Sequence, residues 1–257
     1  MLVRTLVAML SVAALAAFSA APTFAITSGQ PDGGNHPFVG LSADANGFCS
    51  GTLLSPTVFL TAAHCFAANE SVTVVIDPSG VWANPAEVVG IVHNDPQFCL
   101  ACGNGLPNAD THDLAVVVLQ NPITLDAYGL LPKPGLVDTL PPQPSVTLVG
   151  YGIQGYSRQG HGGPQVVDDF QRTFAPTRLV PNSSVLSASF ITLMANPGNG
   201  QGGVCFGDSG GPDILGNSRT VVALNSLVAN NARCSGVSYS YRIDTPNALS
   251  FIGTFLG

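Results

Sequence analysis

The stretch at residues 207–212, which reads Gly-Asp-Ser-Gly-Gly-Pro, restricts the fold of this chain more than any other. Three glycines and a proline within six residues exclude a helix or a regular strand, so the backbone must turn here. In such a turn, several backbone N–H groups can point to one place beside the Ser209 hydroxyl, as an oxyanion hole requires. A serine hydroxyl becomes an effective nucleophile only when a base takes its proton. The stretch therefore indicates either a glycine-rich surface turn or a nucleophilic serine, and the rest of the chain must decide.

The positions of the histidines distinguish two kinds of serine hydrolase. In the nucleophile elbow of α/β-hydrolases, the acid and the histidine follow the serine along the chain. Here every histidine precedes Ser209; they are His36, His64, His93, His112 and His161. The elbow is therefore excluded, and the order that remains is histidine, then aspartate, then serine.

His64 and Asp113 occur in contexts that suit a base and its acid. His64 ends an apolar run and follows two alanines, which allow close packing, and Cys65 comes directly after it. Asp113 opens the run Asp-Leu-Ala-Val-Val-Val-Leu at 113–119, which predicts a buried strand. A carboxylate at the mouth of such a strand needs a hydrogen-bond donor, and an imidazole N–H is a suitable one. Three such motifs in this order favour a catalytic triad.

These motifs resemble the signatures of the chymotrypsin/trypsin-like serine proteases. The matching stretches are Thr-Ala-Ala-His-Cys at 61–65, Asp-Leu-Ala-Val at 113–116 and the Gly-Asp-Ser-Gly-Gly-Pro turn. The resemblance extends from Ile26 to the C-terminus and includes residues 48–54 and 150–152. It implies an all-β fold of two six-stranded antiparallel β-barrels with a C-terminal α-helix and the active site in the cleft between the barrels. It also implies a triad and an oxyanion hole, formed by His64, Asp113 and Ser209 and by the N–H groups of Gly207 and Ser209.

The composition agrees with that fold. Glycine (29) and proline (20) are plentiful and only 9% of the residues are charged, which favours short strands and turns over helices. We expect a first barrel over residues 26–131, a proline-rich linker over 132–144, a second barrel over 145–245 and a C-terminal helix over 246–257. Expected strands include 72–76 and 88–92 in the first barrel, and 145–149, 220–227 and 238–243 in the second.

Residues 1–25 are typical of a secretory signal peptide. Arg4 precedes an apolar stretch over 6–17, and small residues continue to Ala25; the stretch is too short to span a membrane. We therefore expect a secreted, extracellular protein. Cleavage after Ala25 would release Ile26, whose ammonium, as the resemblance implies, pairs with Asp208. The alternative is a short propeptide that another protease removes. N-terminal sequencing of the secreted protein decides, since a start before Ile26 would exclude direct activation.

Six cysteines allow fifteen pairings. The resemblance selects two disulfides close to the triad, Cys49–Cys65 and Cys205–Cys234. The other two cysteines, Cys99 and Cys102, have the C-x-x-C spacing of a redox or zinc half-site. No second pair is present to complete a zinc site, so we favour a local disulfide in the loop before Asp113.

The resemblance also predicts the residues that bind substrate, namely Gly203, Val204, Phe206, Ser226, Leu227 and Val228. In trypsin-like members, the residue six before the nucleophile is an aspartate that binds lysine or arginine. That residue is Gly203 here, so cleavage after basic residues is not expected. Val228 replaces a glycine of the pocket wall, as in elastase-like members. The predicted preference is therefore for small to medium apolar side chains.

The formal charge of -7 argues against nucleic acid or an anionic membrane as a partner. We expect a monomer that acts on a peptide or protein substrate and needs no metal or organic cofactor. Two other functions stay open: a catalytically silent binding protein on a protease fold, and an esterase. The intact triad argues against the first, and a comparison of ester with peptide substrates tests the second.

Overall fold

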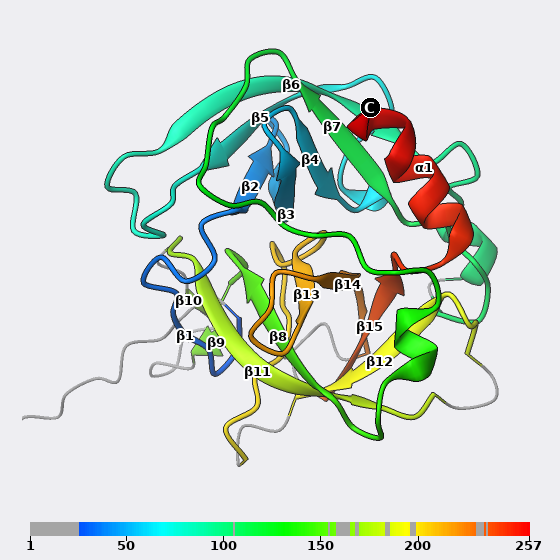
Figure 1. The fold of residues 1–257 in the computed structure, drawn as a ribbon. Helices are drawn as coiled ribbons and strands as arrows, with labels where there is room; N and C mark the ends of the chain where they lie inside the picture. The colour runs from blue at the N-terminus through cyan, green and yellow to red at the C-terminus, as the bar shows by residue number, and fades with distance from the viewer. Residues whose placement is uncertain are drawn as a thin grey trace, which may run out of the picture.

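The computed structural model describes residues 26–104, 106–153, 155–157, 165–167, 170–182, 186–195, 199–229, 234 and 236–257. The predicted signal peptide, residues 1–25, lies outside the described residues. The described chain forms two β-barrels, one above the other in Figure 1, with one α-helix against the upper barrel. Within the described residues, no helix is long and apolar enough to cross a membrane.

The first barrel is a closed ring of six antiparallel strands in the order β2-β3-β4-β7-β6-β5. The strands are β2 (Val39–Ala43), β3 (Phe48–Ser55), β4 (Val58–Thr61), β5 (Ser71–Ile76), β6 (Ala86–Asn94) and β7 (Ala115–Leu119). Side chains alternate between the two faces of a strand, so in β5 the apolar Val72, Val74 and Ile76 point inward while the residues between them are more exposed. They pack against Leu53 and Phe59 in the core of the barrel.

The strand expected to open at Asp113 begins two residues later, at Ala115. His112 has a positive φ of 48°, and its carbonyl accepts a hydrogen bond from the Leu114 N–H (2.8 Å). The chain therefore turns sharply just before β7. This turn leaves Asp113 outside the strand ladder, with its carboxylate available to a neighbouring loop.

The second barrel closes where β8 pairs with β11, in the strand order β11-β12-β15-β14-β13-β8. Its strands are β8 (Ser145–Gly150), β11 (Thr173–Val180), β12 (Phe190–Met194), β13 (Pro212–Leu215), β14 (Val221–Val228) and β15 (Val237–Arg242). The short β1 (Gln30–Pro31) extends this sheet beside β11, and β9 (Gly155–Ser157) and β10 (Gln165–Val167) form a separate pair. Two closed six-stranded barrels and a C-terminal helix confirm the predicted fold class.

The helix α1 (Pro246–Leu256) follows the second barrel but packs on the first. It begins with a cap, because the Thr245 hydroxyl accepts a hydrogen bond from the Ala248 N–H (3.3 Å) and a proline occupies the first turn. The ring of Phe255 lies 5.1 Å from that of His93 in β6. The end of the chain thus binds the two halves together (Figure 1).

A buried arginine joins the barrels more directly. Arg172 stands just before β11, and its side chain is fully buried. Its guanidinium pairs with Asp32 (2.8 Å) and donates hydrogen bonds to the carbonyls of Val39 (3.0 Å) and Asp77 (2.7 Å). It also donates to the hydroxyl of Tyr151 (3.3 Å), which follows β8. One side chain thus connects the first barrel, the second barrel and the segment that precedes both.

Candidate active site

The pairing of β4 with β7 brings the predicted base and acid together. Thr61 at the end of β4 lies opposite Ala115 at the start of β7. His64 follows Thr61 by three residues, in the short 3-10 helix η1 (Ala63–Cys65), and Asp113 precedes Ala115 by two. Both residues therefore project beyond the same end of the ladder, from neighbouring loops.

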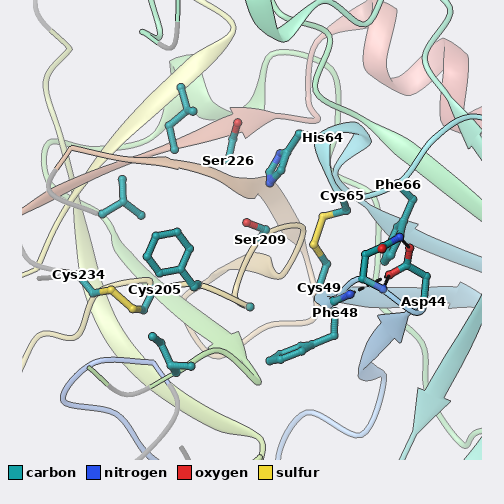
Figure 2. Close-up of a pocket in the computed structure, with 17 residues that line it drawn as sticks. Asp44, Phe48, Cys49, His64, Cys65, Phe66, Cys205, Ser209, Ser226 and Cys234 are labelled. Carbon is teal, nitrogen blue, oxygen red and sulfur yellow. Dashed lines mark hydrogen bonds between the residues drawn. A yellow bond between two sulfur atoms is a disulfide. The ribbon is translucent and has the colours of Figure 1, made fainter. Parts of the chain in front are cut away.

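Asp113 fixes the position of the His64 ring. The carboxylate accepts a hydrogen bond from the His64 backbone N–H (2.9 Å) through Oδ1 and contacts His64 Nδ1 (2.8 Å) through Oδ2. The Ser226 hydroxyl donates a further hydrogen bond to Oδ2, and Asp113 is fully buried. With Nδ1 donating to Asp113, the other ring nitrogen, Nε2, is left as an acceptor. Figure 2 shows the ring directed toward Ser209.

The two residues of this pair shift each other's pKa. Burial alone would lower the pKa of His64, but the charge and the hydrogen bond of Asp113 outweigh it and raise that pKa above the ordinary histidine value. Burial acts to raise the pKa of Asp113, yet the charge on His64 and the hydrogen bonds from His64 and Ser226 lower it. Asp113 is therefore ionised at neutral pH, beside a histidine ring that it helps to protonate.

The loop that carries Ser209 approaches the first barrel closely. A Cβ at Gly210 would collide with the Thr61 hydroxyl, and Gly210 has a positive φ of 74°, so only glycine fits there. Its N–H donates to the carbonyl of Asn225 (2.8 Å), whose own N–H donates to Gly211 (3.0 Å). These bonds hold the residues after Ser209 against β14.

The peptide that precedes Gly207 is oriented from the second barrel. The carbonyl of Phe206 accepts a hydrogen bond from the Ile153 N–H (2.8 Å). The C=O and N–H groups of a trans peptide point in opposite directions, so the Gly207 N–H points away from Ile153. The Asp208 carboxylate accepts hydrogen bonds from the N–H groups of Gly152 (2.9 Å) and Cys205 (2.8 Å). This arrangement is compatible with an oxyanion hole.

One open pocket of about 690 Å³ contains both Ser209 and His64 in its lining. On one side of Ser209 lies the Cys205–Cys234 disulfide, and on the other side lie Phe48 and the Cys49–Cys65 disulfide (Figure 2). Four of the six predicted substrate-binding residues also line this pocket: Phe206, Ser226, Leu227 and Val228.

Gly203 and Val204, the other two, are not among the described residues that line the pocket. Gly203 pairs with Thr27, whose N–H donates to the Gly203 carbonyl (2.8 Å). Val204 is buried in the core of the second barrel, beside Leu148. Gly203 thus pairs with a neighbouring segment, and Val204 packs in the core of the second barrel.

Comparison with known proteins places this geometry in a family. The family model described as Trypsin matches residues 26–252. This chain belongs to the trypsin family. Its likeness to a solved structure titled "HL collagenase structure at 1.7A resolution" has a TM-score of 0.68 at 19% identity, covers 89% of this chain and 97% of that chain, and shows the shared fold.

Three relatives of this trypsin-family chain share 27–31% of its residues over the matched regions. It is 29% identical over 178 residues to human chymotrypsin-like elastase family member 3B, a match that covers 64% of this chain and 60% of that protein. It is 31% identical over 175 residues to brachyurin from Leptuca pugilator, covering 64% of this chain and 70% of that protein. It is 27% identical over 192 residues to a trypsin from Saccharopolyspora erythraea, a match that covers 71% of this chain and 78% of that protein. The match thus spans less than two thirds of the length of the human elastase.

The first described residue of this trypsin-family chain lies inside the second barrel. Ile26 is fully buried and packs against Val146 and Leu148. In the full chain it is joined to Ala25, so the ion pair between a free Ile26 ammonium and Asp208 stays a prediction. The bridge between Thr27 and Gly203 does bring the start of the described chain beside the segment that leads to Asp208.

The structure forms three disulfides, Cys49–Cys65, Cys99–Cys102 and Cys205–Cys234, as expected from the sequence. Cys49, His64 and Cys65 lie close enough together to suggest a metal site. Both sulfurs are in a disulfide, however, and a disulfide sulfur is not the thiolate that a metal binds. The Cys99–Cys102 bond likewise removes the zinc half-site from consideration.

Proposed function

We propose that this chain is a secreted serine endopeptidase that cleaves after small to medium apolar residues. One observation carries the proposal: His64 is bonded through Nδ1 to a buried, ionised carboxylate, and the same histidine shares a pocket with Ser209. Family membership supports it, as does the chain's similarity to an elastase family member, a trypsin and brachyurin. The predicted signal peptide and the three disulfides support secretion.

The reaction follows from the roles of the three side chains. His64 Nε2 takes the proton of the Ser209 hydroxyl as its oxygen attacks the carbonyl carbon of the peptide. Asp113 holds the ring and stabilises its charged form. The N–H groups of Gly207 and Ser209 receive the negative oxygen. His64 then protonates the leaving amine, and water, deprotonated by His64, releases the acyl group and restores Ser209.

Activation is the second part of the proposal. A free Ile26 ammonium would pair with Asp208, whose carboxylate already accepts two backbone hydrogen bonds within the second barrel. Loss of one partner from a buried ion pair costs about 3–5 kcal/mol, which is enough to disorder the loop of Ser209. Cleavage before Ile26 would therefore complete the oxyanion hole.

A serine-reactive phosphonate ester tests the catalytic part. We expect it to modify the purified, secreted protein at Ser209, because a serine hydroxyl is a weak nucleophile until a base takes its proton. The Ser209→Ala variant should not be labelled. The matched control is Ser218→Ala, which changes an exposed serine of the hairpin between β13 and β14 and should be labelled like the wild type. A folded wild-type protein that is not labelled would favour the catalytically silent binding protein.

A panel of chromogenic peptides and matched esters tests the substrate. The pocket wall formed by Phe206, Leu227 and Val228 offers apolar contacts and no charge for a basic side chain. We therefore expect the highest kcat/KM for peptides with alanine or valine before the scissile bond. Val228→Gly should raise kcat/KM for phenylalanine relative to alanine, since it removes side-chain volume from the wall. Fastest cleavage after arginine would refute the preference, and turnover of esters alone would favour the esterase.

A further inference from the structure

Ser50 occupies an unusual place between the two barrels. It belongs to β3 in the first barrel, and its side chain is fully buried. Its backbone N–H donates a hydrogen bond to the carbonyl of Ser209 (2.9 Å). Its hydroxyl donates to the carbonyl of Gly207 (2.8 Å) and accepts from the N–H of Tyr151 (3.0 Å). One residue of the first barrel thus bonds three backbone groups of the second.

These bonds fix Gly207 from both sides. The carbonyl that precedes Gly207, that of Phe206, is bonded to the Ile153 N–H, and the carbonyl of Gly207 itself is bonded to the Ser50 hydroxyl. A glycine at a positive φ of 94° has no side chain to restrict it, so its orientation depends on such outside contacts. With both neighbouring peptide planes held, the direction of the Gly207 N–H is set.

We propose that Ser50 is a positioning residue, whose hydroxyl aligns the Gly207 N–H with the negative oxygen of the transition state. Ser50 does not touch the substrate, because it is not among the described residues that line the pocket. The Ser50 hydroxyl carries no charge and, unlike the predicted Ile26–Asp208 pair, acts without a free chain terminus. The inference rests on the proposed endopeptidase function, and it adds a contact from the first barrel to the oxyanion hole.

The test compares Ser50→Ala with Ser42→Ala in the mature protein. Ser42 is the matched control: it is also a fully buried serine of the first barrel, and its hydroxyl makes a long contact (3.5 Å) with Cys49 of the same barrel. For Ser50→Ala we expect kcat to fall roughly tenfold or more, less than the ~10²–10³-fold loss that follows removal of an oxyanion donor itself. KM should stay within about twofold, because the hydroxyl acts on the transition state and not on the bound substrate.

A second readout separates positioning from a general loss of structure. A peptidyl boronic acid places an oxygen in the oxyanion hole, so its affinity for Ser50→Ala should fall by the same factor as kcat/KM. Ser42→Ala should keep both values. If Ser50→Ala does not fold, Ser50→Gly, which keeps the backbone contacts, should show the same loss of kcat. If Ser50→Ala in an active protein left kcat and boronate affinity unchanged, the inference would be overturned while the proposed function would stand. Equal losses in Ser42→Ala would have the same meaning. An inactive, unlabelled wild type would overturn the proposed function and the inference with it.

Discussion

Replacement of Asp113 by asparagine is expected to lower turnover by about 10⁴-fold, the loss established for this change in the reference enzyme of the family. The carboxylate accepts hydrogen bonds from the His64 backbone, from the His64 ring and from the Ser226 hydroxyl. An amide has one oxygen in place of two and would present an N–H to the ring. His64 would then carry its proton on Nε2, where it blocks removal of the proton from Ser209.

Stopped-flow or steady-state hydrolysis of one chromogenic peptide measures the effect, with the thermal midpoint as a check on folding. The matched control is Asp44→Asn. Asp44 lines the same pocket, but its Oδ1 accepts hydrogen bonds from the N–H groups of Asn46 (2.8 Å) and Gly47 (2.9 Å) in its own turn. Asp44→Asn should stay within about threefold of the wild type, as expected for a change that leaves the reacting groups in place. Equal activity of Asp113→Asn and the wild type would show that the three residues do not act as a triad.

Replacement of Asp213 by asparagine is expected to stabilise the protein progressively as the pH rises from about 4 to about 8. Asp213 is fully buried in β13, and neither carboxyl oxygen has a hydrogen-bond partner within the described residues. Burial raises its pKa from 3.8 to about 8; the nearby Ser240 hydroxyl offsets this only in part, because it points toward Asn225 (3.5 Å).

The direction in which the unfolding free energy changes with pH follows from proton linkage. Between the two pKa values, the unfolded chain has lost the proton of Asp213 while the folded chain keeps it. The wild type therefore loses up to about 1.4 kcal/mol of unfolding free energy per pH unit through this group, a loss that begins near pH 4 and ends near pH 8. Asparagine cannot ionise, so the difference between variant and wild type should widen over this window and be smallest at its acid end.

Urea unfolding at pH 4.5, 6 and 8 measures that difference. Asp77→Asn is the matched control, because Asp77 is also buried but its oxygens accept hydrogen bonds from Ser79 and from the Ala83 N–H (3.1 Å). Burial alone would raise the pKa of Asp77, but these bonds lower it below its usual value, so Asp77→Asn should destabilise the protein at neutral pH. A constant difference between Asp213→Asn and the wild type across the three pH values would contradict the buried, protonated Asp213.

The triad candidates could be proposed from the sequence because each stands in a short stretch with its own signal, and the fold class followed from the family resemblance that these stretches carry. The turn at 207–212, the run that ends at His64 and the run that starts at Asp113 each contain their own signal. The disulfide between Cys99 and Cys102 is local as well. In each case, the residues next to one another along the chain supply the physical reason for the prediction.

The contacts that orient the site could not be predicted in this way. Ser50 lies 157 residues from Gly207, and nothing near either residue in the sequence indicates that a hydroxyl of one barrel holds a carbonyl of the other. Asp213 stands among apolar residues that read as an ordinary strand. The start of β7 at Ala115, two residues later than expected, depends on a left-handed turn at His112, which is not glycine. Such features result from the packing of the two barrels against each other.

The buried guanidinium of Arg172 has a consequence for how a peptide enters the cleft. Separating the two barrels would take the carbonyls of Val39 and Asp77 away from that charge, in a region that is fully buried. A buried charged donor that loses its acceptors costs more than the roughly 1–3 kcal/mol of a neutral group, so we expect an opened form to be rare. We therefore expect the cleft to keep one width and, under the proposed function, to admit a polypeptide as an extended segment. Exposed or unfolded loops of other proteins would meet that requirement, whereas compact folded domains would not.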